Sequence, residues 1–168
     1  MPLRNEFEIG SSHFWLGNSL TAARRYSEAI RAFSDAKTLA LDDSWNNGWL
    51  GVAYYLNGNL PDALKVCEGA ADISELICAA ITYDRIGQRE DAERALAKLR
   101  AAQGEGGAVS YAWGYAQWGD RGRALDYLEA AMRSRDPWLQ FVKTYPLTDP
   151  LREEPRFQAV LRELKFPD

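Results

Sequence analysis

Histidine is nearly absent from this sequence, and its scarcity limits the chemistry that the chain can perform. His13 is the sole histidine, which excludes a metal site built from several imidazoles and leaves any histidine-based relay resting on one residue. No nucleophile at a suitable spacing accompanies it, and GEGG at 104–107 lacks the lysine and hydroxyl partners of a phosphate-binding loop. We therefore expect no enzyme activity, no catalytic residues, no metal site and no cofactor.

Long apolar runs and an excess of basic residues are also missing. No uninterrupted apolar stretch approaches the roughly 18 residues of a membrane-spanning helix, and the start, MPLRNEFEIG, has no signal-peptide core. The 20 Lys and Arg residues are outnumbered by 24 Asp and Glu, for a net charge of -4. Nucleic acids and anionic membranes select for clustered positive charge, so neither is an expected partner. We expect a cytoplasmic protein.

Cysteine is also rare, with Cys67 and Cys78 as its two occurrences, each inside a strongly helical stretch. Free cysteine is among the most buried residue types, so we expect both to serve as small apolar core residues. A disulfide or a reactive thiol is the alternative interpretation. A reducing compartment disfavours the disulfide.

What the sequence does contain is an internal repeat. FWLGNSLTAARRYSEAIRAF at 14–33 aligns with GWLGVAYYLNGNLPDALKVC at 48–67, an offset of 34 residues from position 14 to position 48. Two weaker copies follow, ICAAITYDRIGQREDAERAL at 77–96 and VSYAWGYAQWGDRGRALDYL at 109–128. Repeats of this length are typical of stacked helix hairpins.

Each copy has the same order of small and bulky residues. A small residue in the first helix is followed by a large one and then, beyond a turn, by an alanine and a bulky apolar residue or thiol. The small residues let two antiparallel helices approach closely, and the large ones fill the grooves beside them. The four sets are Gly17, Leu20, Ala29 and Phe33; Gly51, Tyr54, Ala63 and Cys67; Ala80, Tyr83, Ala92 and Leu96; and Ala112, Tyr115, Ala124 and Leu128.

The segments between helices carry turn and capping signals. Glycine opens the turn in three copies, at Gly58, Gly87 and Gly119, because a residue that tolerates positive φ ends a helix at low cost. The junction GAADIS at 69–74 is short, and Asp72 is expected to cap the next helix. QGEGGA at 103–108 is expected to end the preceding helix and to form a flexible joint.

After residue 136 the repeat pattern gives way to a different one. We expect a short helix from Pro137, an extended Tyr145–Pro146 segment, a turn at Asp149–Pro150 and a final helix that starts near Pro155. Apolar residues at helical spacing share one face of this last helix and predict that it shields the open side of the last repeat. They are Phe157, Val160, Leu161 and Leu164.

The layout resembles the tetratricopeptide repeat (TPR) family. Leu50-Gly51 with Tyr54, Leu16-Gly17, and the runs from Ala29 to Ala36 and from Ala63 to Ala70 match its pattern. The family's tryptophan near the start of each repeat is replaced here, and its closing proline is absent or shifted. DPLREEPRF at 149–157 resembles the tail that ends bacterial TPR arrays of signalling and regulatory proteins.

This resemblance implies an all-α fold, a right-handed α-solenoid of about four helix-turn-helix hairpins with C-terminal capping helices. The chain is expected to form a single domain, 1–168. The repeats are placed at approximately 10–43, 44–71, 72–103 and 104–136, and the cap at 137–168.

The family also implies where a partner would bind. In TPR arrays the first helices of the hairpins line a concave groove. Trp45, Trp49 and Tyr55 are not needed to build their hairpin, so we expect an exposed aromatic stripe there. The alternative is that the N-terminal segment or the C-terminal cap covers these rings. The residues predicted to line the groove are Phe14, Asn18, Trp45, Trp49, Val52, Tyr55, Ile77, Ile81, Asp84, Arg85, Trp113 and Gln117.

An apolar groove predicts an apolar peptide or an amphipathic helix of another protein as the partner. The carboxylate tail of heat-shock chaperones is not expected, because the family's clamp positions hold Phe14, Asn18, Trp49, Ser74 and Cys78, and no cation is among them. Three alternatives stay open. They are a self-assembly scaffold that forms homo-oligomers, the regulatory part of a bacterial signalling system, and a small-molecule sensor that uses the aromatic groove.

Overall fold

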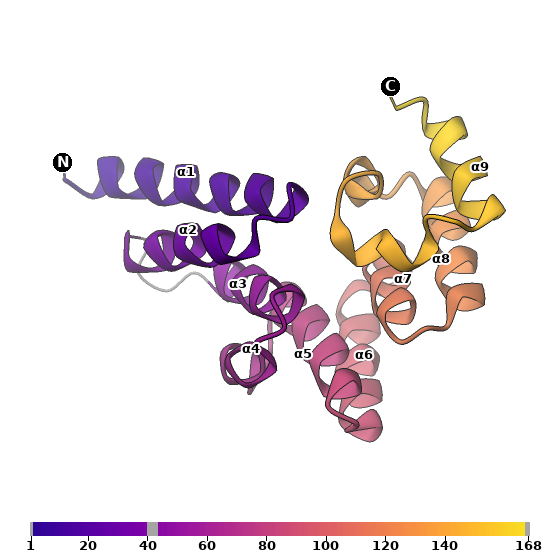
Figure 1. Ribbon diagram of the computed structural model, residues 1–168, viewed down its shortest axis with the longest axis horizontal. Coiled ribbons are helices and arrows are strands. Elements are labelled where there is room, and N and C mark those ends of the chain that lie inside the picture. The colour runs from indigo at the N-terminus through magenta and orange to yellow at the C-terminus, as the bar shows by residue number, and fades with distance from the viewer. Residues whose placement is uncertain (1, 40–43, 167–168) are drawn as a thin grey trace. The chain divides into compact units, whose positions relative to one another are not determined.

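The structure is a computed structural model that describes residues 2–39 and 44–166, and in 2–9, 44 and 45 it describes the backbone alone. The described residues form helices joined by short turns and contain no strand (Figure 1). The all-α prediction is confirmed for this part of the chain. Packing divides the chain into two compact units, 1–95 and 96–168.

The first unit consists of helices that pack on their neighbours in sequence. Helix α1 packs on α2, α2 on α3, and α3 on both α4 and α5, while α4 also contacts α5 (Figure 1). A sixth helix, α6, begins in this unit and ends in the next. Their bounds are α1 Pro2–Ala22, α2 Tyr26–Leu39, α3 Ser44–Leu56, α4 Leu60–Cys67, α5 Ile73–Arg85 and α6 Arg89–Gln103.

The second unit holds the end of α6, a helix hairpin and the C-terminal cap. Helix α7 packs against α8 and η3, and α8 packs against α9. The bounds are η1 Gly104–Gly107, α7 Ala108–Gln117, α8 Arg121–Ser134, η2 Pro137–Phe141, η3 Pro146–Leu151 and α9 Pro155–Leu164. The helix starts predicted at Pro137 and Pro155 are therefore confirmed, the first as a 3-10 helix.

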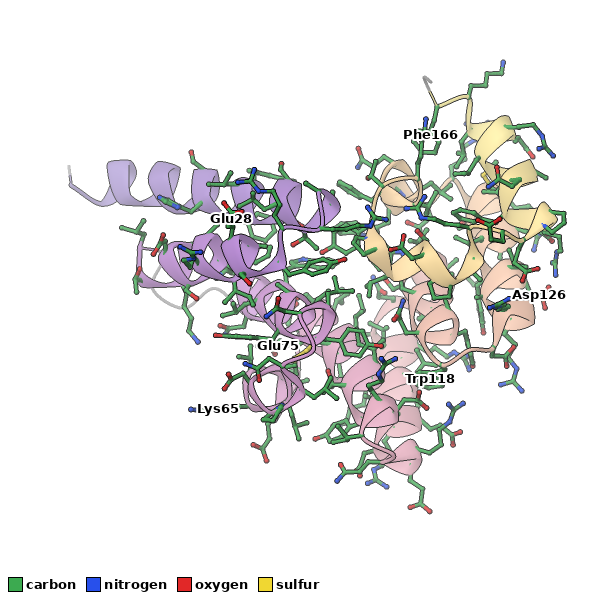
Figure 2. The ribbon with its side chains drawn as sticks, in the orientation of Figure 1. Glu28, Lys65, Glu75, Trp118, Asp126 and Phe166 are labelled. Atoms are coloured by element: carbon green, nitrogen blue, oxygen red, sulfur yellow. A yellow bond between two sulfur atoms is a disulfide. The ribbon has the colours of Figure 1, made fainter. Side chains whose placement is uncertain are left out.

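Helix α9 is fastened to α8 by an apolar contact and two ion pairs. Phe157 and Val160 are buried as predicted. Arg156 donates from Nη2 to Asp126 at 2.7 Å and from Nε to Glu129 at 2.9 Å; Asp126 is labelled in Figure 2. The guanidinium hydrogen bond lowers the pKa of Glu129. These exposed pairs orient the helix, and the buried face supplies most of the stabilisation.

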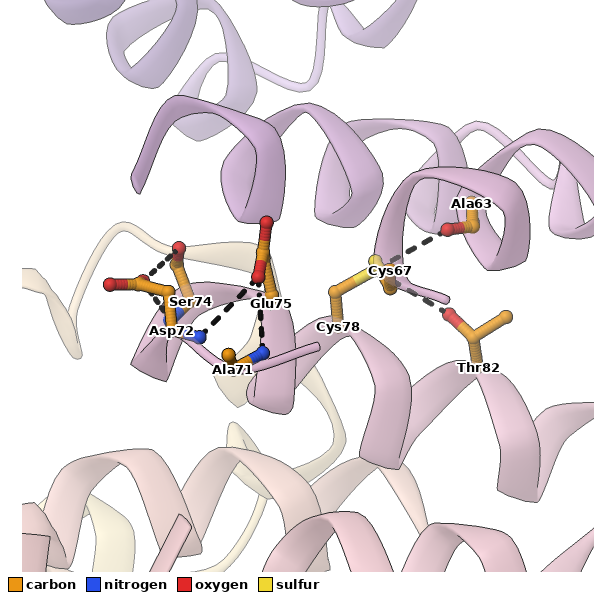
Figure 3. The surroundings of a disulfide bond; sticks show 8 residues. All are labelled: Ala63, Cys67, Ala71, Asp72, Ser74, Glu75, Cys78 and Thr82. Carbon is orange, nitrogen blue, oxygen red and sulfur yellow. Dashed lines mark hydrogen bonds between the residues drawn. A yellow bond between two sulfur atoms is a disulfide. The ribbon is translucent and has the colours of Figure 1, made fainter. Parts of the chain in front are cut away.

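The predicted turns and caps are also present. Gly58 has a φ of +80°, and Gly87 and Gly119 occupy the same region at +83° and +79°. Asp72 caps α5 in a reciprocal capping box (Figure 3): its Oδ1 accepts from the Ser74 N–H at 3.0 Å, and Glu75 accepts from the Asp72 N–H at 3.4 Å. Local sequence therefore sets where these helices begin and end.

The repeated small residues form the contacts between helices. All four alanines of the second helices, Ala29, Ala63, Ala92 and Ala124, are fully buried. A Cβ atom on Gly17 would lie 2.7 Å from the buried ring of Phe33. The approach is tightest where α3 meets α5, because a Cβ on Gly48 would overlap the backbone of Ser74. These helices can pack at this distance only with small residues at the contact.

The two cysteines form a disulfide between α4 and α5 (Figure 3). Their Cα atoms are 6.0 Å apart, and the exposed fractions of Cys67 and Cys78 are 1% and 0%. The prediction that both residues are buried is confirmed. The preferred interpretation as separate thiols is wrong. The short connection between α4 and α5 brings the two side chains together. The alternative of a disulfide holds.

The tight approach at Gly48 gives a first prediction. Gly48→Ala should lower the free energy of unfolding by about 2 kcal/mol, because the methyl group meets backbone atoms that cannot rotate away. Urea denaturation measures the change. Gly106→Ala is the control: its Cβ would meet nothing within 4 Å, so its stability should be unchanged or slightly increased. Equal destabilisation by both variants would contradict the contact.

The disulfide gives a second prediction. Reduction should lower the free energy of unfolding by roughly 3 kcal/mol, because the bond closes a loop with a sequence separation of 11 residues. Urea denaturation with and without reductant measures it. The Cys67→Ala/Cys78→Ala variant should show no response to reductant. A thiol assay that finds two free thiols in the unreduced, denatured protein would refute the disulfide.

Candidate functional site

The residues predicted to line a groove all lie on the first helices of the hairpins. Phe14 and Asn18 belong to α1, those from 45 to 55 to α3, those from 77 to 85 to α5, and Trp113 and Gln117 to α7. Their placement on these helices agrees with the repeat pattern. Trp45 is part of α3, but its side chain lies outside the described residues.

Trp49 and Tyr55, the members of the expected aromatic stripe whose side chains are described, are not exposed. The exposed fractions are 2% for Trp49, 7% for Tyr55 and 1% for Trp113. The apolar groove residues Val52, Ile77 and Ile81 are likewise buried. The prediction that these rings are free for a partner is therefore wrong, since in the structure they belong to the interior.

Trp113 shows the physical reason. Its ring lies against two aromatic residues of the cap: Trp138, edge-on at 6.1 Å between centroids, and Tyr145 at 5.5 Å. On the same helix, Gln117 donates from Nε2 to the carbonyl of Leu147 at 2.9 Å. Large apolar surface is buried by the nearest segment that can cover it. For Trp113 that segment is the C-terminal cap.

Tyr55, Asp84 and Arg85 are brought together at the ends of α3 and α5. Burial raises the pKa of Tyr55, and the nearby Arg85 guanidinium partly offsets that rise. Asp84 accepts a hydrogen bond from Arg89 Nη1 at 2.6 Å. The polar groups of Tyr55, Asp84 and Arg85 therefore interact with one another and with Arg89 at the start of α6. A neutral Tyr55 has no role as a base at physiological pH.

On α1 the predicted groove residues Phe14 and Asn18 make contacts within the first hairpin. Asn18 donates from Nδ2 to the carbonyl of Phe14 at 3.1 Å, within its own helix. The half-buried Phe14 ring packs edge-on against Phe33, with centroids 5.9 Å apart. It also contacts Trp15 at 5.3 Å. The predicted groove residues here form the edge of a surface that continues onto Trp15.

That surface is the most exposed apolar feature of the described residues. Trp15 has an exposed fraction of 59% and Leu16 one of 49%. With the exposed Ser12 and Ser19 they follow one helical stripe, at i, i+3, i+4 and i+7. We call these four residues the α1 stripe. No charged residue occurs from 9 to 23, so the stripe is uncharged along its length.

Leu16 differs in exposure from its equivalent in the second repeat. It aligns with Leu50, which is 4% exposed, and both precede the small glycine of their repeat. Helix α3 packs against α2, α4 and α5, whereas α1 packs chiefly against α2. Equivalent positions therefore have different neighbours. The signal that marks the stripe in the sequence is the charge-free segment 9–23, in a chain in which 26% of residues are charged.

The exposure pattern can be checked with tryptophan fluorescence. Trp15→Phe should markedly reduce the fraction of emission that acrylamide quenches, because Trp15 is the most exposed tryptophan among those described. Trp113→Phe should remove protected emission and leave the quenchable part unchanged. Equal loss of quenchable emission in both variants would show that Trp113 is accessible.

No family model, curated protein or solved structure matches the chain. Within the described residues, no group of three or more His, Cys, Asp or Glu side chains is placed to hold a metal ion. Nor do residues 2–39 and 44–166 include a helix with the length and apolar character to cross a bilayer.

Proposed function

We propose that this protein is a non-catalytic interaction module, a TPR-type array whose α1 stripe binds the apolar face of a helix from another protein. The observation that carries the proposal is the exposure of Trp15 and Leu16 side by side on an uncharged helix face. An exposed apolar patch marks a contact surface more often than a catalytic one.

Support for an array comes from the buried repeat positions. Each predicted hairpin contains two helices, and equivalent positions are buried in each: the alanines of the second helices, and Ala80 and Ala112 of the first. Hairpins of this kind bury their faces by stacking on one another, which is the principle of a right-handed TPR solenoid. The solenoid arrangement is part of the proposal.

Support for a helical partner comes from the composition of the stripe. Tryptophan contributes a large rigid contact area and is enriched among the residues that dominate binding energy. Ser12 and Ser19 are small, so a helix can approach closely on either side of the Trp15–Leu16 pair. Because the stripe has no charge, it offers no partner to a charged face and favours an apolar one.

The cytoplasmic location expected from the sequence belongs to the same proposal. The Cys67–Cys78 disulfide counts against it, because disulfides are rare in reducing compartments. The burial of both sulfurs limits contact with a reductant. Mass spectrometry of the protein purified under conditions that trap thiols would show which redox state the cell maintains.

A peptide selection tests the proposed surface. Amphipathic helical peptides selected from a display library against the full chain should bind wild-type protein and lose at least about tenfold in affinity to Trp15→Ala/Leu16→Ala. Ile86→Ala is the matched control, because Ile86 is also exposed, at 38%, and lies away from α1, in the turn that follows α5. Both variants should keep the helicity and stability of the wild type, since exposed side chains are replaced.

The outcomes separate the partner from its alternatives. Peptides that bind wild type and the stripe variant equally well would refute the stripe as the binding surface. Light scattering across protein concentrations tests self-assembly: a dimer that the stripe variant loses would assign the surface to a second copy of the chain. Trp49→Ala with Tyr55→Ala is unsuitable, because both residues are buried and their loss would report on folding.

A further inference from the structure

A hollow of about 650 Å³ lies within the second unit, between the end of α6, η1, α7 and α8. Its volume falls in the range of small-molecule sites, about 300–1,000 Å³. The walls include two arginines, Arg100 and Arg133, two tyrosines, Tyr111 and Tyr127, and one carboxylate, Glu105. None of these residues was predicted to be functional.

Arg100 is held in place by tyrosines and has no carboxylate partner among the described residues. Its Nη2 donates to the hydroxyl of Tyr115 at 2.5 Å and to that of Tyr127 at 2.7 Å. The guanidinium carbon lies 5.4–5.7 Å from the ring centroids of Tyr111, Tyr115 and Tyr127. Cation–π contact and hydroxyl acceptors fix the orientation of the group but leave its positive charge without a counter-ion.

Arg133 adds a second cation to the same hollow, and its charge also helps to lower the pKa of Glu129, one turn away on α8 and outside the lining of the hollow. The Arg133 side chain is exposed, and among the described residues it makes no hydrogen bond or ion pair. Glu105 is the carboxylate of the wall, so the five wall residues named above carry two positive charges against one negative. This excess is notable in a chain with a net charge of -4, and it attracts anions.

The tyrosines supply a neutral aromatic wall beside these charges. Tyr111 packs edge-on against Tyr127 at 5.3 Å, and Tyr127 stacks on Tyr115 with the ring planes 4° apart. Trp118, labelled in Figure 2, packs edge-on against Tyr115 and supports the cluster. The Tyr111 hydroxyl donates to the carbonyl of Gly104 at 2.6 Å. Burial raises the pKa of Tyr111, so this ring is uncharged at neutral pH.

We propose that this hollow binds a small organic anion that carries a planar ring. Arg100 and Arg133 hold the carboxylate or phosphate group, and Tyr111 and Tyr127 lie against the ring. Guanidinium groups bind both kinds of anion through charge-assisted hydrogen bonds. The site goes beyond the interaction function and shares no residue with the α1 stripe, so either proposal can fail without the other.

Calorimetric titration of the full chain tests the site with phenyl phosphate, benzoate and inorganic phosphate at constant ionic strength. At least one of the two ring-bearing anions should bind saturably with a Kd of about 1 mM or lower, and whichever binds more tightly identifies the favoured acid group. Inorganic phosphate should bind at least about tenfold more weakly than the better of the two, because it cannot use the tyrosine wall.

Three substitutions make the test specific. Arg133→Gln should weaken binding about tenfold, and Glu105→Gln should strengthen it several-fold, since one removes an attractive charge and the other a repulsive charge. Arg162→Gln is the matched control: this exposed arginine lies on α9 and does not line the hollow. Arg133 is preferable to Arg100 for the test, because Arg100 also holds the tyrosines together.

Several results would overturn the proposal. One is the absence of saturable binding of both ring-bearing probes to wild-type protein. Another is equal weakening by Arg162→Gln and Arg133→Gln, which would indicate a general charge effect. Binding of inorganic phosphate as tight as that of the better ring-bearing probe would refute the role of the tyrosine wall. Circular dichroism of each variant confirms that the fold is retained.

Discussion

The close approach of α3 to α5 is the contact on which the first unit depends. Gly48 and Gly51 lie one turn apart on α3, and a methyl group on either would overlap atoms of its neighbours, at Gly48 the backbone of α5. With glycine at these positions the helices pack at a distance that a larger residue would prevent. Trp49 and Val52, which follow these glycines on α3, are buried as well.

In the second unit the C-terminal cap covers the helix at the centre of the packing. Helix α7 is buried on nearly every side, with Trp113 covered by Trp138 and Tyr145 and with Gln117 bonded to η3. A helix packed in this way leaves little surface for another protein, apart from the part of it that lines the hollow. The chemistry that stays accessible in this unit therefore lies at the hollow between α6, η1, α7 and α8, where two guanidinium groups meet a wall of tyrosines.

The two proposed surfaces share a physical origin. The repeat pattern specifies the small residues that hold the helices together, and both proposed surfaces are formed by other side chains. Trp15 is exposed because α1 packs chiefly on α2 and leaves its opposite face uncovered. The hydrogen bonds of Arg100 go to tyrosine hydroxyls and to no carboxylate among the described residues, so its charge is left without a counter-ion. The exposed Trp15 and the Arg100 guanidinium without a counter-ion are both features that helix packing does not require.

The sequence by itself determined the helices, their turns and caps and the small residues at their contacts, because these depend on neighbours within a few positions: Asp72 caps α5 through Ser74 and Glu75, and Gly58 takes the positive φ of its turn. The tertiary structure alone decided which large residues are exposed. Trp49 and Trp15 sit on equivalent helices, yet one is 2% and the other 59% exposed, since burial depends on which distant segment packs over a face. The Cys67–Cys78 bond and the Arg100 cluster were decided in the same way, by side chains that only folding brings together.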